Sequence, residues 1–138
     1  MTRLRKLLVS AALLLGSLTA ISGSAGAVDL NGAWATSVEE CDKVFTREGG
    51  KLGFSEMSDV YGGGFIVDGD QIVGKYGRCK IKTRKDNGPN VNLIAACATD
   101  IMLSSVQFSV KELDADNIVR LFPGMEDIEL RYHRCPSR

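Results

Sequence analysis

Apolar and polar residues alternate along most of the chain after residue 28, and no stretch has the spacing expected of a long helix. A period of two indicates strands that bury one face and expose the other to water. The alternation predicts strands over residues 31–36, 51–54, 65–67, 71–75, 78–84, 91–98, 105–113, 118–122 and 129–134. Strands joined by sequential hairpins must close on themselves or stack as two sheets to hide their apolar faces and free edges.

Turn-forming residues separate these strands. The run Asp68-Gly69-Asp70 lies between two apolar segments and predicts a hairpin, because glycine supplies the positive φ that the turn requires. The three glycines at residues 62–64 predict a bend or bulge that opens the next strand. Residues 37–45 predict a helical turn capped by Ser37, whereas residues 46–50 predict a loop and residues 85–90 a turn.

These elements predict an all-β fold. We expect a small up-and-down antiparallel β-barrel of about eight strands, with one short helical turn after the first strand. The alternative is a two-sheet β-sandwich, which would hide the same apolar faces.

The first 27 residues have the features of a secretory leader. Arg3, Arg5 and Lys6 precede an apolar stretch at residues 7–18, and Ala25-x-Ala27 supplies the small residues that signal peptidase needs. The apolar stretch is shorter than the roughly 20 residues that span a bilayer. We therefore expect a signal peptide at residues 1–27, a single domain at 28–138, and a periplasmic or secreted protein without a membrane anchor.

The charge balance changes when the leader is removed. Three of the seventeen basic residues lie in the leader, so fourteen basic residues face seventeen acidic ones and the net charge is −3. A negative balance argues against nucleic acid as a partner. We expect a monomer that carries no cofactor.

Four cysteines follow the leader, at Cys41, Cys79, Cys97 and Cys135. An even number in a small exported domain predicts two disulfides, whereas a metal site would need closely spaced pairs. Cys41 lies in the helical turn expected to cap the barrel, and Cys79 has the inward phase of its strand. We predict the pairs Cys41–Cys79 and Cys97–Cys135, with Cys41–Cys97 and Cys79–Cys135 as the alternative.

The beginning of the folded part carries a resemblance. The residues Asp29-Leu30-x-Gly32-x-Trp34 resemble the start of the lipocalin-like, or calycin, barrels, and the chain resembles small exported proteins of this kind from alphaproteobacteria. The resemblance implies that Gly32 and Trp34 close one barrel end. With Cys41, the segment is also distantly similar to periplasmic metalloprotease inhibitors. These inhibitors insert an N-terminal segment into the protease, whereas only residues 28–31 precede Gly32 here, a reach of about 13 Å.

Residues that could support catalysis are few. His133 is the only histidine, and no Gly-x-Ser-x-Gly motif accompanies it. Asp68-Gly69-Asp70 lacks the further acidic residues of a calcium loop, and the glycines at 62–64 lack the lysine of a phosphate loop. We therefore predict no catalytic, cofactor-binding or metal-binding residues.

A basic stripe is the remaining candidate for binding. Strict alternation over residues 78–84 would place one set of side chains on a single face: Arg78, Lys80, Lys82 and Arg84. Such a face could bind an anionic glycan, a phosphate-rich surface or an acidic protein patch, or could be an ordinary solvated strand face.

The sequence thus predicts an exported, non-enzymatic binding protein for a small molecule or a protein partner. The alternatives are a periplasmic peptidase inhibitor and, with fewer supporting residues, a small hydrolase. A ligand cavity inside the barrel would favour a small molecule. A filled barrel with an apolar surface would favour a protein partner.

Overall fold

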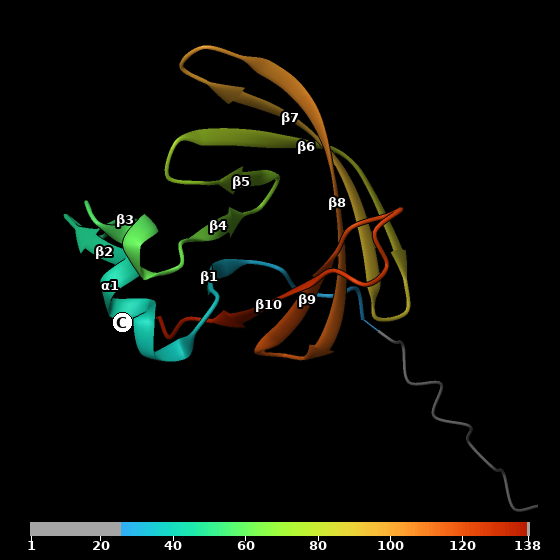
Figure 1. Ribbon diagram of the computed structural model, residues 1–138, viewed down its shortest axis with the longest axis horizontal. Helices are drawn as coiled ribbons and strands as arrows, with labels where there is room; N and C mark the ends of the chain where they lie inside the picture. Colours follow the sequence, from blue (N-terminus) through green and yellow to red (C-terminus); the bar gives the residue numbers. More distant parts are fainter. Residues whose placement is uncertain (1–25, 138) are drawn as a thin grey trace, which may run out of the picture.

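The computed structural model describes residues 26–137, so the predicted leader lies outside the described part except for Gly26 and Ala27. Eight strands form a closed barrel in the order β1-β10-β9-β8-β7-β6-β5-β4, with β4 pairing back to β1 (Figure 1). Every neighbouring pair is antiparallel. The predicted barrel is confirmed, and the alternative of a two-sheet sandwich is wrong.

The predicted strands correspond closely to the barrel strands, which are β1 (Gly32–Ala35), β4 (Gly64–Asp68), β5 (Gln71–Val73), β6 (Gly77–Asn87), β7 (Asn90–Thr99), β8 (Leu103–Asp114), β9 (Asn117–Leu121) and β10 (Glu129–Arg134). The expected hairpin at Asp68-Gly69-Asp70 joins β4 to β5, with Gly69 at φ 57°. Strands β6 and β7 extend further into the predicted turn at residues 85–90 than expected, because Asn87 already pairs with Asn90.

A separate insert lies between β1 and β4. It contains a 3₁₀ turn η1 (Val38–Glu40), a short helix α1 (Cys41–Val44), the strands β2 (Phe45–Glu48) and β3 (Lys51–Phe54), and a 3₁₀ turn η2 (Ser58–Tyr61). The helical turn after the first strand is confirmed. The loop predicted over residues 46–50 is wrong, because most of it belongs to β2, which forms a two-residue hairpin with β3 outside the barrel.

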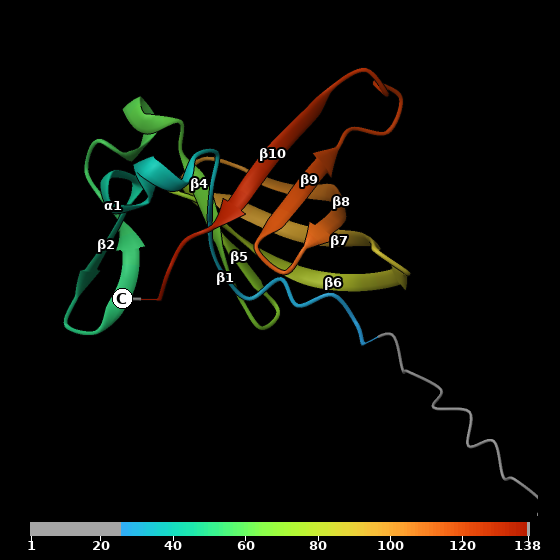
Figure 2. The ribbon, with the colours of Figure 1, turned by 90° about the horizontal axis from the view of Figure 1, so that it is seen from below.

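Two apolar cores hold these parts together. The inner core fills the barrel, and its buried members are Val28, Leu30, Trp34, Val67, Ile72, Val91, Leu93, Val110, Ile118 and Tyr132. The outer core joins the outside of β1 and β4 and the residue after β10 to the insert, through Ala33, Ala35, Cys41, Val44, Phe45, Ile66 and Cys135. Both views place the β2–β3 hairpin beside the barrel, with the segment that follows β10 next to it (Figures 1 and 2).

Trp34 belongs to the inner core. Its side chain is fully buried, and its indole nitrogen donates a hydrogen bond to the carbonyl of Leu30 at 2.8 Å. The guanidinium of Arg134, on the neighbouring strand β10, lies over the indole ring. Gly32 has φ 120°, and a Cβ there would lie 3.2 Å from the Arg134 side chain, so glycine permits the close approach.

Strand β6 contains one extra residue relative to β7. Ile81 pairs with Ala95, but Thr83 pairs with Ile94, so Lys82 is left without a partner in the ladder. This β-bulge reverses the side-chain phase of the strand beyond it. The predicted strict alternation through Arg84 is therefore wrong after Ile81.

The two predicted disulfides are present, but both predicted pairings are wrong. Cys41 bonds to Cys135, and Cys79 bonds to Cys97. Cys79 and Cys97 lie directly opposite each other on β6 and β7, so they are much closer to each other than to the insert. Cys135 follows β10 on the outer side of β1, where its amide donates to the carbonyl of Ala33 and its side chain meets α1. Two disulfides are consistent with an oxidising compartment outside the cytoplasm.

Candidate functional site

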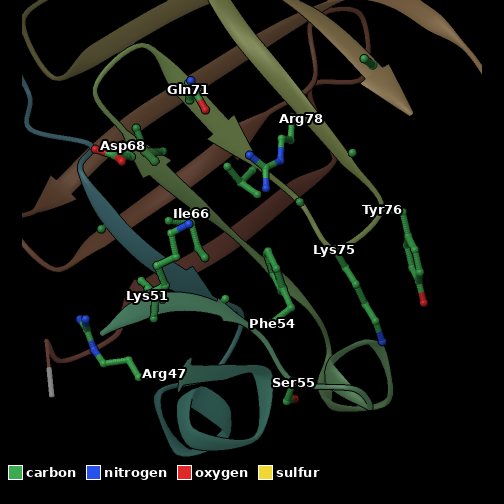
Figure 3. A pocket seen from close by; sticks show the side chains of 18 of the residues that line it. Arg47, Lys51, Phe54, Ser55, Ile66, Asp68, Gln71, Lys75, Tyr76 and Arg78 are labelled. Atoms are coloured by element: carbon green, nitrogen blue, oxygen red, sulfur yellow. The ribbon is translucent and has the colours of Figure 1, made fainter. Parts of the chain in front are cut away.

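An open groove lies outside the barrel, between the β2–β3 hairpin and the wall formed by β4, β5 and the beginning of β6 (Figure 3). Its volume is about 1280 Å³. The hairpin side contributes Arg47 and the seven consecutive residues 50–56. The barrel side contributes residues 66–68, Gln71 and residues 73–78. The cavity therefore uses the outer surface of the barrel as its floor.

The hairpin is held in place by the outer core. Gly49 and Gly50 have φ 57° and 80°, which are the left-handed values needed at both positions of a two-residue turn. Phe45 and Phe54 are paired across the hairpin, with ring centroids 5.2 Å apart, and both belong to or contact the outer core. The Cys41–Cys135 bond ties the helix before β2 to the end of β10. The base of the hairpin is thus fixed, whereas its tip projects along the groove.

One lysine at the groove is committed to a local network. The Lys75 ammonium donates to Asp59 at 2.6 Å and to the carbonyl of Glu56, and it lies 5.3 Å from the centroid of the Tyr76 ring. The hydrogen bond with Asp59 raises the pKa of Lys75 and lowers the pKa of Asp59. This network fastens the η2 turn to the β5–β6 connection at one end of the groove.

Other charged groups at the groove are free. Lys51 and Arg78 have no ion-pair partner within the described residues, and Arg47 makes only a long hydrogen bond of 3.4 Å to the carbonyl of Gly50. The acidic residues at the groove, Glu56, Asp68 and Asp100, have no side-chain partner there either. Figure 3 shows Arg47 and Lys51 at the hairpin side and Asp68 on the opposite wall. The groove therefore has an apolar floor, with positively and negatively charged side chains at its margins.

The four residues of the predicted basic stripe do not lie together. Arg78 and Lys80 are on the outer face of β6, opposite the exposed Ala98 and Ala96. Lys80 forms a 3.3 Å ion pair with Asp70, and only Arg78 reaches the groove. The bulge at Lys82 separates this outer pair from Arg84, so the prediction of a single basic face is wrong.

Arg84 instead faces the inner side of the barrel wall. It lies opposite the buried Leu93, donates to the carbonyl of Val28 at 2.5 Å, and forms a two-pronged contact with Asp86. The hydrogen bond from Arg84 lowers the pKa of Asp86. Its role here is to hold the segment before β1 against the barrel end.

His133 lies on β10 and contacts the neighbouring strand β9. Its Nδ1 lies 2.5 Å from Oδ1 of Asn117 on the neighbouring strand, and the ring is near enough to the carboxyls of Glu39 and Asp114 to help lower their pKa. Within residues 26–137, no group of three or more histidine, cysteine or acidic side chains could hold a metal ion. No helix in this range is long and apolar enough to cross a membrane.

The sequence pattern does not predict the groove. Its hairpin residues, among them Arg47 and Lys51, fall in a predicted loop and a short predicted strand. A signal was present, because Gly49-Gly50 between Phe45 and Phe54 is a hairpin pattern of the kind recognised at Asp68-Gly69-Asp70. Comparisons of the chain with protein-family models, with curated proteins and with solved structures each found no match.

Proposed function

We propose that this chain is an exported, non-enzymatic binding protein that holds a protein partner in the groove outside its barrel. The observation that carries the proposal is the contrast between the two candidate spaces. The barrel interior is occupied by its own buried side chains, from Val28 to Tyr132, whereas the external groove has about 1280 Å³ of open volume. Small-molecule pockets usually fall between about 300 and 1,000 Å³. The larger, open groove suits part of a polypeptide better than a small ligand.

The compartment belongs to the same proposal. The leader at residues 1–27 and the two disulfides support export to the periplasm or the medium. A closed antiparallel barrel is also the fold that the resemblance to calycin barrels implies, although membership of that superfamily remains a prediction.

The peptidase-inhibitor alternative has no contact that favours it. The mechanism implied by the resemblance needs a free N-terminal segment. Val28 and Leu30 are buried in the inner core and Arg84 holds the carbonyl of Val28, so this segment is committed to the barrel. We therefore rest the proposal on the groove.

Selection of random peptides against the oxidised protein tests the proposal. We expect peptides that bind the wild type and lose affinity at least tenfold for Gln71→Trp, because Gln71 is an exposed residue on the groove wall. Ser105→Trp is the matched control, since Ser105 is exposed on β8 outside the groove. Failure to select any peptide, or equal binding by Gln71→Trp and wild type, would overturn the proposal.

A further inference from the structure

Strand β3 has one edge that no strand covers. The β2–β3 hairpin forms its own two-stranded sheet, and β3 pairs only with β2 within the described residues. A strand edge presents backbone N–H and C=O groups that can pair with another extended chain. The edge of β3 is therefore a site defined by backbone chemistry.

The hairpin register identifies which backbone groups are free. The amide of Ser55 donates to the carbonyl of Val44 at 3.0 Å, and the pairs that exchange hydrogen bonds then alternate along the hairpin. Gly53 and Lys51 accordingly bond to β2. Leu52 and Phe54 direct their N–H and C=O groups away from β2, and no described residue bonds to these groups.

The free edge opens on the groove. Residues 50–56 contact the groove consecutively, which is expected where the edge of a strand, and not one of its faces, borders a cavity. A much smaller pocket of about 150 Å³ near Cys135 is lined by the β2 residues Phe45 and Thr46. The four residues of β3 span about 13 Å, so a segment of similar length could pair with the whole edge.

The groove also has a surface for the side chains of such a segment. Leu52, Phe54 and Val73 are half-buried apolar residues beside the buried Ile66. A strand on the β3 edge would direct alternate side chains toward this apolar floor and the others toward solvent. Free charges at the groove margins, on Lys51, Arg78 and Asp68, could meet polar side chains at its ends.

We infer that an extended segment of a partner protein binds by adding to the β3 edge as a third strand, over the outer wall of β4 and β5. This inference rests on the proposed function and gives the occupant of the groove a specific form. Recognition is mainly by backbone hydrogen bonds to Leu52 and Phe54, with apolar side chains at alternate positions of the segment. Segments that contain proline within the paired stretch would be excluded, because they lack the required donor.

A peptide selected against the groove allows a test at Leu52. Leu52→Pro removes a free edge N–H that does not bond to β2, so the hairpin ladder stays intact. Leu52→Ala is the matched control, because it removes the side chain and keeps the N–H. We expect Leu52→Pro to bind the peptide about five- to tenfold more weakly than Leu52→Ala, as for the loss of one hydrogen bond.

Amide hydrogen exchange supplies a second measurement. It uses the wild-type protein, so its result does not depend on whether a variant folds. Peptide binding should slow exchange at Leu52 and Phe54 at least tenfold, and change it little at Lys51 and Gly53, which already bond to β2. Equal affinities of Leu52→Pro and Leu52→Ala together with unprotected amides at Leu52 and Phe54 would overturn the inference. A peptide that still depends on Gln71 would then leave the proposed function standing, whereas the absence of any groove-binding peptide would overturn both.

Discussion

The guanidinium carbon of Arg134 lies 4.3 Å from the centroid of the Trp34 indole ring. The same guanidinium donates to the carbonyl of Asp29 at 2.8 Å and to the carbonyl of Asn31. Arg134 thereby joins the last barrel strand to the segment that precedes the first one. The guanidinium thus combines a cation–π interaction with hydrogen bonds to three backbone carbonyls, because its Nε also donates to the carbonyl of Ala115 at 3.0 Å.

Replacing Arg134 should weaken the link between β10 and the segment before β1. We expect Arg134→Gln to lower the free energy of unfolding by about 1–3 kcal/mol, since the cation–π contact and the charged hydrogen bonds are both lost. Urea denaturation measures the change. Lys85→Gln, at an exposed position on β6, serves as the control and should stay within about 0.5 kcal/mol of wild type. Equal losses for the two variants would contradict the assigned role of Arg134.

Trp34 should contribute more than Arg134 to the free energy of unfolding. Its side chain is fully buried in the inner core, so Trp34→Ala should cost about 3–5 kcal/mol. Ile101→Ala removes an apolar side chain from a residue that is 91% exposed and should change stability little. A Trp34→Ala variant with a wild-type unfolding midpoint would show that the fold does not depend on burial of the indole.

The two disulfides should differ in their contribution to the free energy of unfolding. The Cys41–Cys135 bond spans 94 residues and the Cys79–Cys97 bond spans 18. The chain-entropy relation gives about 4.7 kcal/mol for the longer loop and about 3.2 kcal/mol for the shorter one. We expect the double alanine variant at Cys41 and Cys135 to be the less stable in urea. Non-reducing peptide mapping should yield the Cys41–Cys135 and Cys79–Cys97 peptides, and any other pairing contradicts the structure.

Acid should remove the stabilisation contributed by Asp86. Arg84 lowers its pKa below the ordinary value of 3.8, so the contribution is complete above about pH 4 and is lost as pH falls through the folded-state pKa. Asp86→Asn should cost up to about 1 kcal/mol near neutral pH and less near about pH 2. Asp127→Asn, in an exposed connection, is the control. A loss at Asp86 that is the same at both pH values would argue against the ion pair.

Two glycines give a matched test of backbone approach. A Cβ on Gly64 would collide with the carbonyl oxygen of Trp34 and lie 2.9 Å from Cζ of Phe45, whereas a Cβ on Gly53 meets nothing within 4 Å. We expect Gly64→Ala to destabilise the protein by about 1–3 kcal/mol, as for overpacking, and Gly53→Ala to be nearly neutral. Thermal unfolding of both variants measures the difference, and similar midpoints would be inconsistent with the crowding at Gly64.

Alternation predicted the barrel strands well because each of them has one wet face and one apolar face. It missed β2, since Arg47 and Glu48 give that strand no apolar alternation and its stability depends on Phe45 packing against Phe54. The groove could not be predicted from the sequence pattern either, because it forms only where the insert and the barrel wall come together. The cysteine pairing failed because it depends on register, and register in β6 depends on the bulge.

The β-bulge in β6 divides the strand into two segments with opposite side-chain phase. Regular pairing with β7 holds over residues 77–81 and again over residues 83–87. Lys82, between them, has no partner on β7. If Lys82 were deleted, every other pair of the β6–β7 ladder could remain, including Cys79 opposite Cys97 and Arg84 opposite Leu93. A shortening of the strand at this one position would therefore preserve its geometry. A deletion elsewhere in β6 would reverse the side-chain phase of the residues between the deleted position and the bulge.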